Sequence, residues 1–397
     1  MSIRYFNDLP SNLQEYDIVV GIPSYNNENT IAYVAKTAAR GIAELGLKGL
    51  IANSDGGSND KTVEQFLSVD TGKENIDKIS IKYKGIPGKG SAIRALFEVA
   101  HKVNAKVFIM LDSDLRSVEP WWMERLAKPI LEGKTDYVTP LYLRHKYDGT
   151  ITNNICYPLT SVLYGVKIRQ PIGGDFGVAR LLIEKYLEKP ETVWQTNVAR
   201  FGIDIWMTTI AINESDKKPV QAALGAKVHD VKDPGKHLQG MFIQVVQTLF
   251  EMMIEYQENW KMVEDVLPVE TYGDQPDQAV EEIHVNLEAL KERAKSVLLE
   301  MKDNAYFIPK GIFEQVISTG TIDSSKWVET VYEAALEYKK TRKEEVILAL
   351  LPLYFARVAD FVEQTVEMDS LEAEREIEKQ LELFRELKKN FIERWRN

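Results

Sequence analysis

The first half of the chain alternates short apolar blocks with amphipathic stretches, and this alternation is the feature that most constrains the fold. Residues 17–23 form the first apolar block, and residues 27–45 have the apolar spacing of a helix. The same pattern predicts strands at 47–54, 79–83, 107–110 and 137–139 and helices at 60–67 and 89–102. Strands that alternate with helices in this way indicate a parallel sheet with right-handed crossovers.

Two carboxylates, Asp112 and Asp114, stand just beyond the apolar block 107–110. Such an unbroken apolar run is typical of a buried parallel strand, and open α/β sheets bind ligands at the carboxyl ends of their strands. At this spacing both side chains lean to the same side of an extended chain and can reach one cation. Mg²⁺ prefers few carboxylates together with phosphate oxygens and water, so the pair fits a bound nucleotide diphosphate. By itself, a D-x-D tripeptide is a weak motif.

Polar loops follow three other predicted strands. The loop 23–28 offers amides and side chains that can hold a base and ribose, although Asn27 can equally cap the next helix. Asp55 lies in a second loop, beside two glycines that permit a tight turn, and can bond a base or ribose. In the loop 86–91, amides at a helix start and Lys89 favour a diphosphate, and the alternative is a glycine-rich turn with a solvated lysine.

Composition limits the classes of protein that the sequence can encode. The 397 residues suffice for about two domains, and a net charge of −11 without a basic tract argues against a nucleic-acid binder. The single cysteine, Cys156, excludes an internal disulfide. We find neither the apolar core of a signal peptide nor a stretch long enough for a bilayer, so we expect a cytoplasmic protein without membrane insertion.

Beyond about residue 250 the sequence becomes helical, so we expect an α/β domain over 1–250 and an α-helical domain over 251–397. Helices are predicted at 241–260, 281–301, 327–339, 346–366 and 371–395, with a linker or surface loop at 268–278. Asp369 and Glu372 have capping-box spacing before the last helix. That helix carries an apolar stripe of Ile377, Leu381, Phe384, Leu387, Phe391 and Trp395. The stripe either packs within the chain or forms a homodimer interface.

An ordered set of short motifs runs through the α/β half. The first four are P-x-x-N-x-E at 23–28, D-G-G-S-N-D at 55–60, P-G-K-G at 87–90 and D-S-D at 112–114. Their order resembles the GT-A glycosyltransferases that use nucleotide-diphospho-sugars. Three later segments, Q-P-I-G-G-D at 170–175, F-G-I-D-I at 201–205 and K-V-H at 227–229, are similar to segments of glucosyl-3-phosphoglycerate and mannosylglycerate synthases. The resemblance covers about residues 17–250, and its later segments are the more specific ones.

The resemblance implies a Rossmann-like GT-A sandwich and a metal-dependent, retaining hexosyltransferase. Such an enzyme moves glucose or mannose from a UDP- or GDP-sugar to D-glycerate or 3-phosphoglycerate, in the synthesis of a compatible solute. Asp114 and His229 would bind Mg²⁺ or Mn²⁺. The donor-binding residues implied are Pro23, Asn26, Glu28, Asp55, Gly88, Lys89, Asp112, Ser113, Gly173 and Gly174. Lys89, Asp175 and Asp204 would form the catalytic group, and Asp175 and Asp204 can instead be ordinary turn or helix-start carboxylates.

The acceptor loop follows the fifth predicted strand. Arg144 is the residue implied to hold the acceptor carboxylate, with Thr152 and Asn153 as hydroxyl and amide contacts and Lys146 as a second cation. The family arginine after the histidine is missing, because Asp230 follows His229. This weakens the case for a phosphorylated acceptor unless a nearby lysine compensates; the candidates are Lys227, Lys232 and Lys236.

The sequence leaves other functions open. A GT-A enzyme of this kind can use another acceptor, such as a sugar or a polyprenyl phosphate, although no basic amphipathic helix favours a lipid. A nucleotidyltransferase also holds a metal on an α/β sheet, but it needs a glycine- and arginine-rich loop after the first strand, unlike 23–28. A non-catalytic sugar-nucleotide sensor is the remaining alternative.

Overall fold

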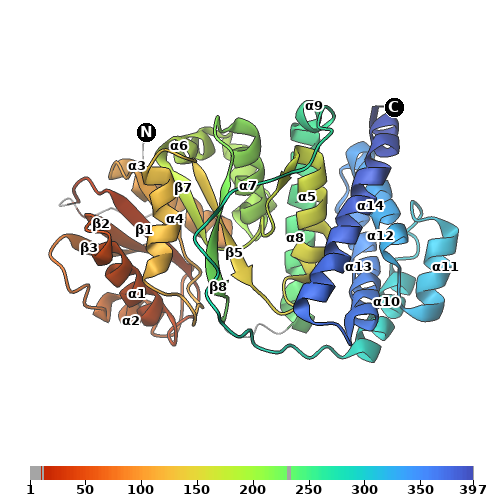
Figure 1. Ribbon diagram of the computed structural model, residues 1–397, viewed down its shortest axis with the longest axis horizontal. Helices are drawn as coiled ribbons and strands as arrows, with labels where there is room; N and C mark the ends of the chain where they lie inside the picture. Colours follow the sequence, from red (N-terminus) through yellow and green to blue (C-terminus); the bar gives the residue numbers. More distant parts are fainter. Residues whose placement is uncertain (1–9, 11–12, 230–233, 397) are drawn as a thin grey trace. The chain divides into compact units, whose positions relative to one another are not determined.

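The computed structural model describes residue 10, residues 13–229 and residues 234–396 (Figure 1). The chain divides into two compact units, each built from three separate segments. The first unit contains residues 1–143, 172–232 and 269–280, and the second contains 144–171, 233–268 and 281–397. The sequence predicted one boundary near residue 250. The units interleave instead because the chain returns twice to the same sheet to add strands.

The described part of the first unit holds one eight-stranded sheet in the order β10-β8-β5-β7-β4-β1-β2-β3. The strands are β1 (Ile18–Ser24), β2 (Gly49–Asp55), β3 (Ile76–Lys82), β4 (Val107–Met110), β5 (Tyr137–Leu143), β7 (Phe176–Ala179), β8 (Val220–Ala226) and β10 (Thr271–Tyr272). All five strands predicted in this half are present. The prediction of a wholly parallel sheet is wrong at β7, which runs antiparallel to both β4 and β5.

Helices cover both faces of this sheet. They are α1 (Ile31–Glu44), α2 (Thr62–Ser68), α3 (Lys89–Lys102), α4 (Trp121–Leu131), α6 (Arg180–Glu188) and α7 (Ile203–Glu214), with the 3₁₀ turns η2 (Glu191–Gln195) and η3 (Asn197–Ala199). α1 packs against α2 and α4 on one face, and α3 packs against α6 on the other. Ile18, Val20 and Ile22 of β1 join the core under α1, whereas Gly21 faces Leu96 of α3. Burial on both faces explains why the strands read as unbroken apolar runs.

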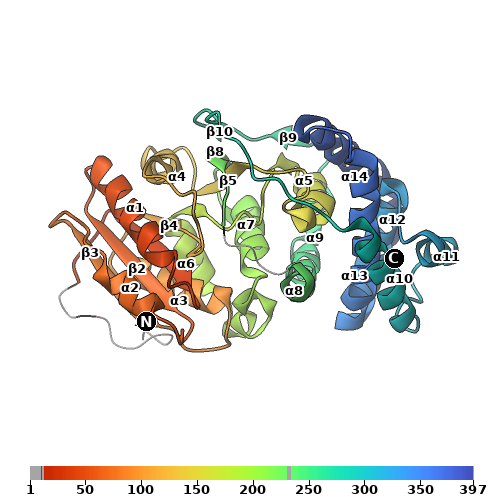
Figure 2. The ribbon, with the colours of Figure 1, turned by 90° about the horizontal axis from the view of Figure 1, so that it is seen from below.

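The second unit is helical (Figure 2). Its elements are the π-helix η1 (Thr152–Cys156), α5 (Tyr157–Tyr164), α8 (Pro234–Glu255), α9 (Gln257–Trp260), α10 (Leu287–Glu300), α11 (Lys310–Thr319), α12 (Ser324–Thr341), α13 (Glu344–Thr365) and α14 (Ser370–Arg396), with the short parallel pair β6 (Val166–Lys167) and β9 (Leu267–Pro268). α13 packs against α8, α10 and α12, and α14 packs against α5 and α12. The predicted helices are present, except that residues 281–286 are not helical and α11 was not predicted.

The apolar stripe of α14 is buried inside the second unit, apart from the half-buried Leu387. Phe391 stacks on Trp260 of α9 and on Tyr332 of α12, with ring centroids 5.7 and 4.2 Å away. The predicted capping box is confirmed, because the backbone N–H of Asp369 donates to Glu372 and that of Glu372 donates to Asp369. The stripe therefore belongs to the core of this unit, and the homodimer stays a prediction. None of the described helices has both the length and the apolar character needed to cross a membrane.

Candidate active site

Strand β7 brings Asp175 to the carboxyl end of β4. Phe176 of β7 pairs with Met110 of β4, and the backbone N–H of Asp112 donates to Asp175 Oδ1 at 2.8 Å. The Tyr142 hydroxyl, from β5, donates to the other oxygen of the fully buried Asp175. Burial raises the pKa of Asp175 above its usual range, against the opposing charge of Lys227. The antiparallel strand that the sequence did not predict is thus the element that completes this site.

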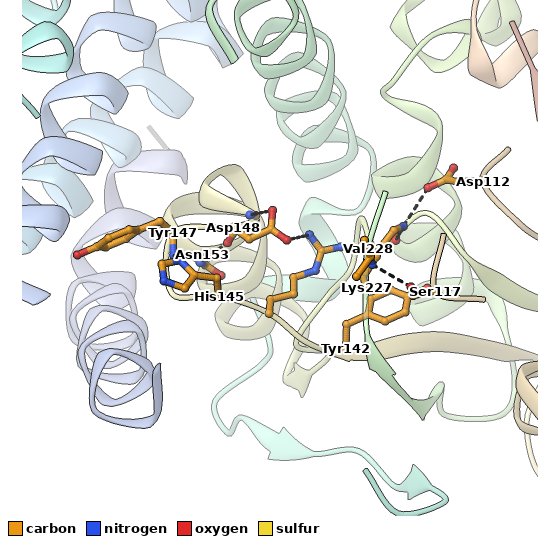
Figure 3. Close-up of polar contacts among 12 residues, drawn as sticks. Asp112, Ser117, Tyr142, His145, Tyr147, Asp148, Asn153, Lys227 and Val228 are labelled. Carbon is orange, nitrogen blue, oxygen red and sulfur yellow. Dashed lines mark hydrogen bonds and ion pairs between the residues drawn. The ribbon is translucent and has the colours of Figure 1, made fainter. Parts of the chain in front are cut away.

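Lys227 joins two of the predicted site carboxylates. It follows β8, and its Nζ lies 2.8 Å from Asp175 Oδ2 and 3.0 Å from Asp112 Oδ2 (Figure 3). The same Nζ donates to the carbonyl of Gly173 at 2.8 Å, and the side chain is only 4% exposed. The sequence suggested Lys227 only as a substitute for the missing arginine. Its place beside His229 at the end of a strand was the one signal that could have identified it.

A second lysine continues the same row of charges. Lys89 Nζ lies 2.9 Å from Asp112 Oδ1 and 3.4 Å from each carboxylate oxygen of Asp204. Burial lowers the pKa of Lys89, but Asp112 and Asp204 outweigh it and keep the pKa raised. Burial raises the pKa of Asp204, against the opposing effect of Lys89. Asp204, Lys89, Asp112, Lys227 and Asp175 therefore form one chain of alternating charges, which we call the charge chain.

Glycine permits a close approach next to the charge chain. Gly174 has a φ of +92°, and a Cβ there would lie 2.2 Å from Asp112 Oδ2. A side chain would therefore displace either the turn or Asp112. The structure has a turn at residues 171–172 and a bend at Gly174, and Gly174 lies against Asp112 and Lys227, so a turn formed by Gly173 and Gly174 beneath a sugar stays a prediction.

The glycines around Lys89 pack against the segment that leads into α7. The Gly90 N–H donates to the Arg200 carbonyl at 3.2 Å, and a Cβ on Gly90 would lie 1.8 Å from the Val198 oxygen. The Gly88 N–H donates to the Tyr83 hydroxyl at 2.9 Å. Both amides are thus engaged within the protein. Contact between the Lys89 ammonium and a diphosphate stays a prediction.

The first two polar loops bind each other. Asp55 Oδ2 accepts from Ser58 N at 2.8 Å, and the Asn26 N–H donates to Ser58 Oγ at 2.8 Å. Glu28 accepts from the backbone N–H of Lys61 at 3.0 Å. The other residue predicted here to contact the donor, Pro23, is buried within β1. These contacts give the predicted donor residues a loop-ordering role, and donor contact by them remains a prediction.

Ser113 ties the acidic pair to the first loop. Its hydroxyl donates to Asn27 Oδ1 at 2.8 Å, and Tyr25 N donates to the same oxygen at 3.0 Å. Asn27 therefore does not cap α1 with its side chain, so that alternative is wrong. Its amide oxygen instead fixes the loop against the residue between Asp112 and Asp114.

The predicted metal ligands come from backbone segments that run side by side. Leu115 and His229 form an isolated antiparallel bridge, and Arg116 N donates to the Val228 carbonyl at 2.8 Å. Figure 3 also shows Val228 N donating to Ser117 Oγ, at 2.8 Å. Asp114, 6% exposed, thus immediately precedes the residue that pairs with His229.

The donor chemistry of this pair suits a divalent ion. A carboxylate and an imidazole supply two ligands for Mg²⁺ or Mn²⁺, and diphosphate oxygens and water suit the remaining positions. Among the described residues, no group of three or more His, Cys, Asp or Glu side chains is arranged for a metal. Asp230, Lys232 and the Lys236 side chain lie outside the described part of the structure.

The predicted acceptor residues belong to the second unit. Arg144, the residue after β5, places Nη1 3.2 Å from Asp148 Oδ2. Asn153 donates from Nδ2 to the Asp148 carbonyl at 3.0 Å (Figure 3) and accepts from Arg169 Nη2 at 2.8 Å. Thr152 is 7% exposed at the start of η1. Within this unit the three predicted residues lie on one loop and its following π-helix.

Lys146 has a structural role in place of the predicted acceptor contact. Its Nζ donates to the carbonyls of Thr365, Val366 and Met368, at 2.7, 3.1 and 2.6 Å. These carbonyls lie at and just beyond the end of α13, where cations are favoured by the helix dipole. Lys146 is thus a C-terminal cap of α13.

Comparison with known proteins finds similarity to sugar-transferring enzymes. The model of the family described as glycosyl transferase family 2 matches residues 19–189. Similar solved structures include glucosyl-3-phosphoglycerate synthase from Mycobacterium tuberculosis with Mn²⁺, UDP and phosphoglyceric acid, at 22% identity over 60% of this chain and 78% of that chain, with a TM-score of 0.47. The same enzyme with Mg²⁺ and UDP gives 21% identity over 60% and 79% of the two chains and a TM-score of 0.47. No curated protein sequence matches the chain.

Proposed function

We propose that this chain, whose residues 19–189 match the model of glycosyl transferase family 2, is a glycosyltransferase of the GT-A fold that moves a hexose from a nucleotide diphosphate to glycerate or 3-phosphoglycerate. The observation that carries the proposal is the charge chain at the carboxyl ends of β4 and β8, next to the paired backbones of Asp114 and His229. It concentrates charged groups where an open α/β sheet binds its ligand.

The proposed donor site matches the charge that develops in the reaction. Breaking the bond between sugar and phosphate builds negative charge on the leaving diphosphate. Asp114 and His229 would hold Mg²⁺ or Mn²⁺, which when bound supplies positive charge for that diphosphate. Lys89 would add a second positive charge, because its pairing with Asp112 and Asp204 keeps its pKa raised. Glucose and mannose, and uridine and guanosine diphosphates, all remain candidate donors.

Asp204 would orient the sugar, because it is paired with Lys89 and can accept a hydrogen bond from a sugar hydroxyl while its charge stays balanced. Asp175, which is fully buried, would hold Asp112 and Lys227 in place. We assign neither one as a nucleophile. The anomeric configuration of the sugar would be retained if the acceptor hydroxyl attacks on the face that the diphosphate leaves. The departing phosphate oxygen would then take the proton of that hydroxyl. Orientation then contributes more to the rate than an acid–base pair does.

Arg144 would bind the carboxylate of the acceptor, with Thr152 beside it. A guanidinium can hold a carboxylate through two parallel hydrogen bonds, which suits a small hydroxy acid. Lys146 bonds to the carbonyls at the end of α13, so Arg144 is the cation of the acceptor loop that we assign to the acceptor. One guanidinium matches the single carboxylate of glycerate. This favours glycerate as the first acceptor to test. We also propose that the chain forms a homodimer and acts in the cytoplasm, as the sequence predicts.

The test is release of UDP or GDP from glucose and mannose donors, with Mg²⁺ or Mn²⁺, in the presence of glycerate, 3-phosphoglycerate or no acceptor. Release that depends on one of the acids supports the proposal and identifies the acceptor. Release that is equal with and without either acid rejects these acceptors, and sugars and polyprenyl phosphate are then tested next. Arg144→Met tests the acceptor proposal by itself, because it should raise the acceptor KM and leave the donor KM unchanged.

A further inference from the structure

A proline removes a backbone donor where the π-helix η1 meets α5. The Tyr157 N–H donates to the Thr152 carbonyl, five residues back, so it does not serve Asn153 as it would in an α-helix. Pro158 stands five residues after Asn153 and four after Asn154, and proline has no N–H to offer either carbonyl. Donors from other elements can take its place.

Two buried side chains from the C-terminal helices supply those donors. Trp327 Nε1 of α12 donates to the Asn154 carbonyl at 2.7 Å. Gln380 Nε2 of α14 donates to the Asn153 carbonyl at 3.1 Å and to the Asn154 carbonyl at 3.3 Å. Trp327 is fully buried and Gln380 is 1% exposed, so water does not compete for these bonds. The two side chains replace the N–H that Pro158 lacks.

A buried arginine fixes the direction of the Gln380 amide. Arg357 Nε donates to Gln380 Oε1 at 2.7 Å, and its Nη1 lies 2.7 Å from Asp360 Oδ2. With its oxygen held by Arg357, Gln380 must point its NH₂ group at the π-helix. The buried Arg357 therefore sets the orientation in which Gln380 donates to the carbonyls of η1.

A third contact from α14 reaches the same turn through a side chain. Arg169 makes two bonds to Glu374, at 2.6 and 2.8 Å, and donates to Asn153 Oδ1 at 2.8 Å. Since Asn153 Nδ2 donates to Asp148, both ends of its amide are held. Helices α12 and α14 therefore fix the backbone and one side chain of a single turn.

We propose that Gln380 and Trp327 are positioning residues for acceptor recognition, holding η1 in the π conformation that presents Thr152 beside the Arg144 loop. This inference rests on the proposed function, because it takes Thr152 and Arg144 as the acceptor contacts. π-helical turns occur frequently at functional sites, and here three buried side chains, Trp327, Gln380 and Arg357, maintain one. The C-terminal helices thereby gain a role in substrate selection.

The experiment uses substitutions that remove the donor atoms. Gln380→Glu keeps the size of the side chain and the oxygen facing Arg357 but replaces the NH₂ group with a second oxygen. Trp327→Phe loses Nε1 and one ring of the indole but keeps an aromatic ring. Gln257→Glu is the matched control, because Gln257 also contacts α14, accepting from Trp395 Nε1 at 3.0 Å, away from η1. Full-length variants are assayed for nucleotide release at varied donor and varied acceptor, with thermal unfolding measured alongside.

We expect the acceptor KM to rise about tenfold in Gln380→Glu and Trp327→Phe, with the donor KM within about twofold of wild type and Gln257→Glu unchanged. Unchanged acceptor KM in both variants beside an active wild type overturns the inference, as does an equal loss of donor and acceptor binding. If Gln380→Glu does not fold, the acceptor KM is measured in Gln380→Met and Trp327→Phe instead, with the same expected rise. A wild type whose nucleotide release does not depend on an acceptor instead marks failure of the proposed function, and the inference falls with it.

Discussion

The ammonium of Lys227 lies 2.8 Å from Asp175 Oδ2, although the two residues are 52 positions apart and neither is exposed. Lys227 also contacts Asp112, so one side chain joins the ends of β4 and β8 and the residue before β7. Removing it leaves two carboxylates that have lost a shared positive charge.

Lys227→Met should therefore lower both stability and turnover. We expect a decrease of about 3–5 kcal/mol in the free energy of unfolding, because the buried carboxylates lose their partner. Lys227→Arg keeps the positive charge and should therefore lose less of the free energy of unfolding. Urea unfolding provides the measurement, and Lys310→Met, at an exposed lysine of α11, serves as the control. A Lys227→Met protein that unfolds at the same urea concentration as wild type would contradict the charge chain as a stabilising feature.

Gly90→Ala should be strongly destabilising, because its new Cβ would meet the Val198 oxygen at 1.8 Å. Gly311→Ala is the matched control: a Cβ at Gly311, in α11, meets nothing within 4 Å. Alanine there should be neutral or stabilise by up to ~1 kcal/mol, through helix propensity. Thermal unfolding of both variants distinguishes a steric requirement for glycine at residue 90 from a general effect of substitution. Equal melting temperatures for the two variants would refute this account.

Asp114→Ala and His229→Ala should each reduce turnover by roughly a hundredfold or more without loss of fold, because both are proposed to hold the metal. The apparent affinity for Mn²⁺, read from rates at increasing metal concentration, should fall in both variants. Asp303→Ala changes an exposed carboxylate and should behave as wild type. Normal metal dependence in either of the first two variants would remove that residue from the metal site.

Glu98 makes stability depend on pH. Burial raises its pKa from 4.5 to about 7, and Arg94, 3.8 Å away, offsets this only in part. The folded state thus keeps the Glu98 proton to higher pH than the unfolded state does. Stability should fall as pH rises from about 4.5 to 7 and change no further above that. Glu98→Gln, neutral at every pH, should lose this slope, so the difference in melting temperature between variant and wild type should grow across that window. A constant difference would contradict the raised pKa.

The sequence predicts the first five strands of the sheet and their helices because each is a continuous stretch with its own apolar period. Asp112 and Asp114 could be located as site residues on the same grounds, since they end one of these runs. Residues 176–179 are too short to display a period, and nothing local marks their antiparallel direction. Asp175 was identified through its motif, but its contact with Asp112 depends on that strand.

Contacts between distant residues explain what the sequence did not predict. Lys227 and Gln380 look like ordinary polar residues, and their partners lie 23 to 227 positions away. The same holds for β10, whose two residues fall in a stretch predicted to be a linker. Thr271 joins the sheet only because Gln221 of β8 pairs with it. In each case the deciding partner is supplied by the tertiary fold.

The late position of β10 in the sequence also affects the order in which the two units can fold during translation. The sheet of the first unit is complete only when β10 has paired with β8, and nearby Gln275 and Gln278 accept hydrogen bonds from the N–H groups of Gly225 and Ala226. A ribosome must therefore translate past residue 278 before this edge can close. By then α8 and α9 have already emerged, but α12 and α14, which hold the π-helix, have not. During synthesis, the strands of the proposed donor site can assemble before the turn proposed for the acceptor is secured.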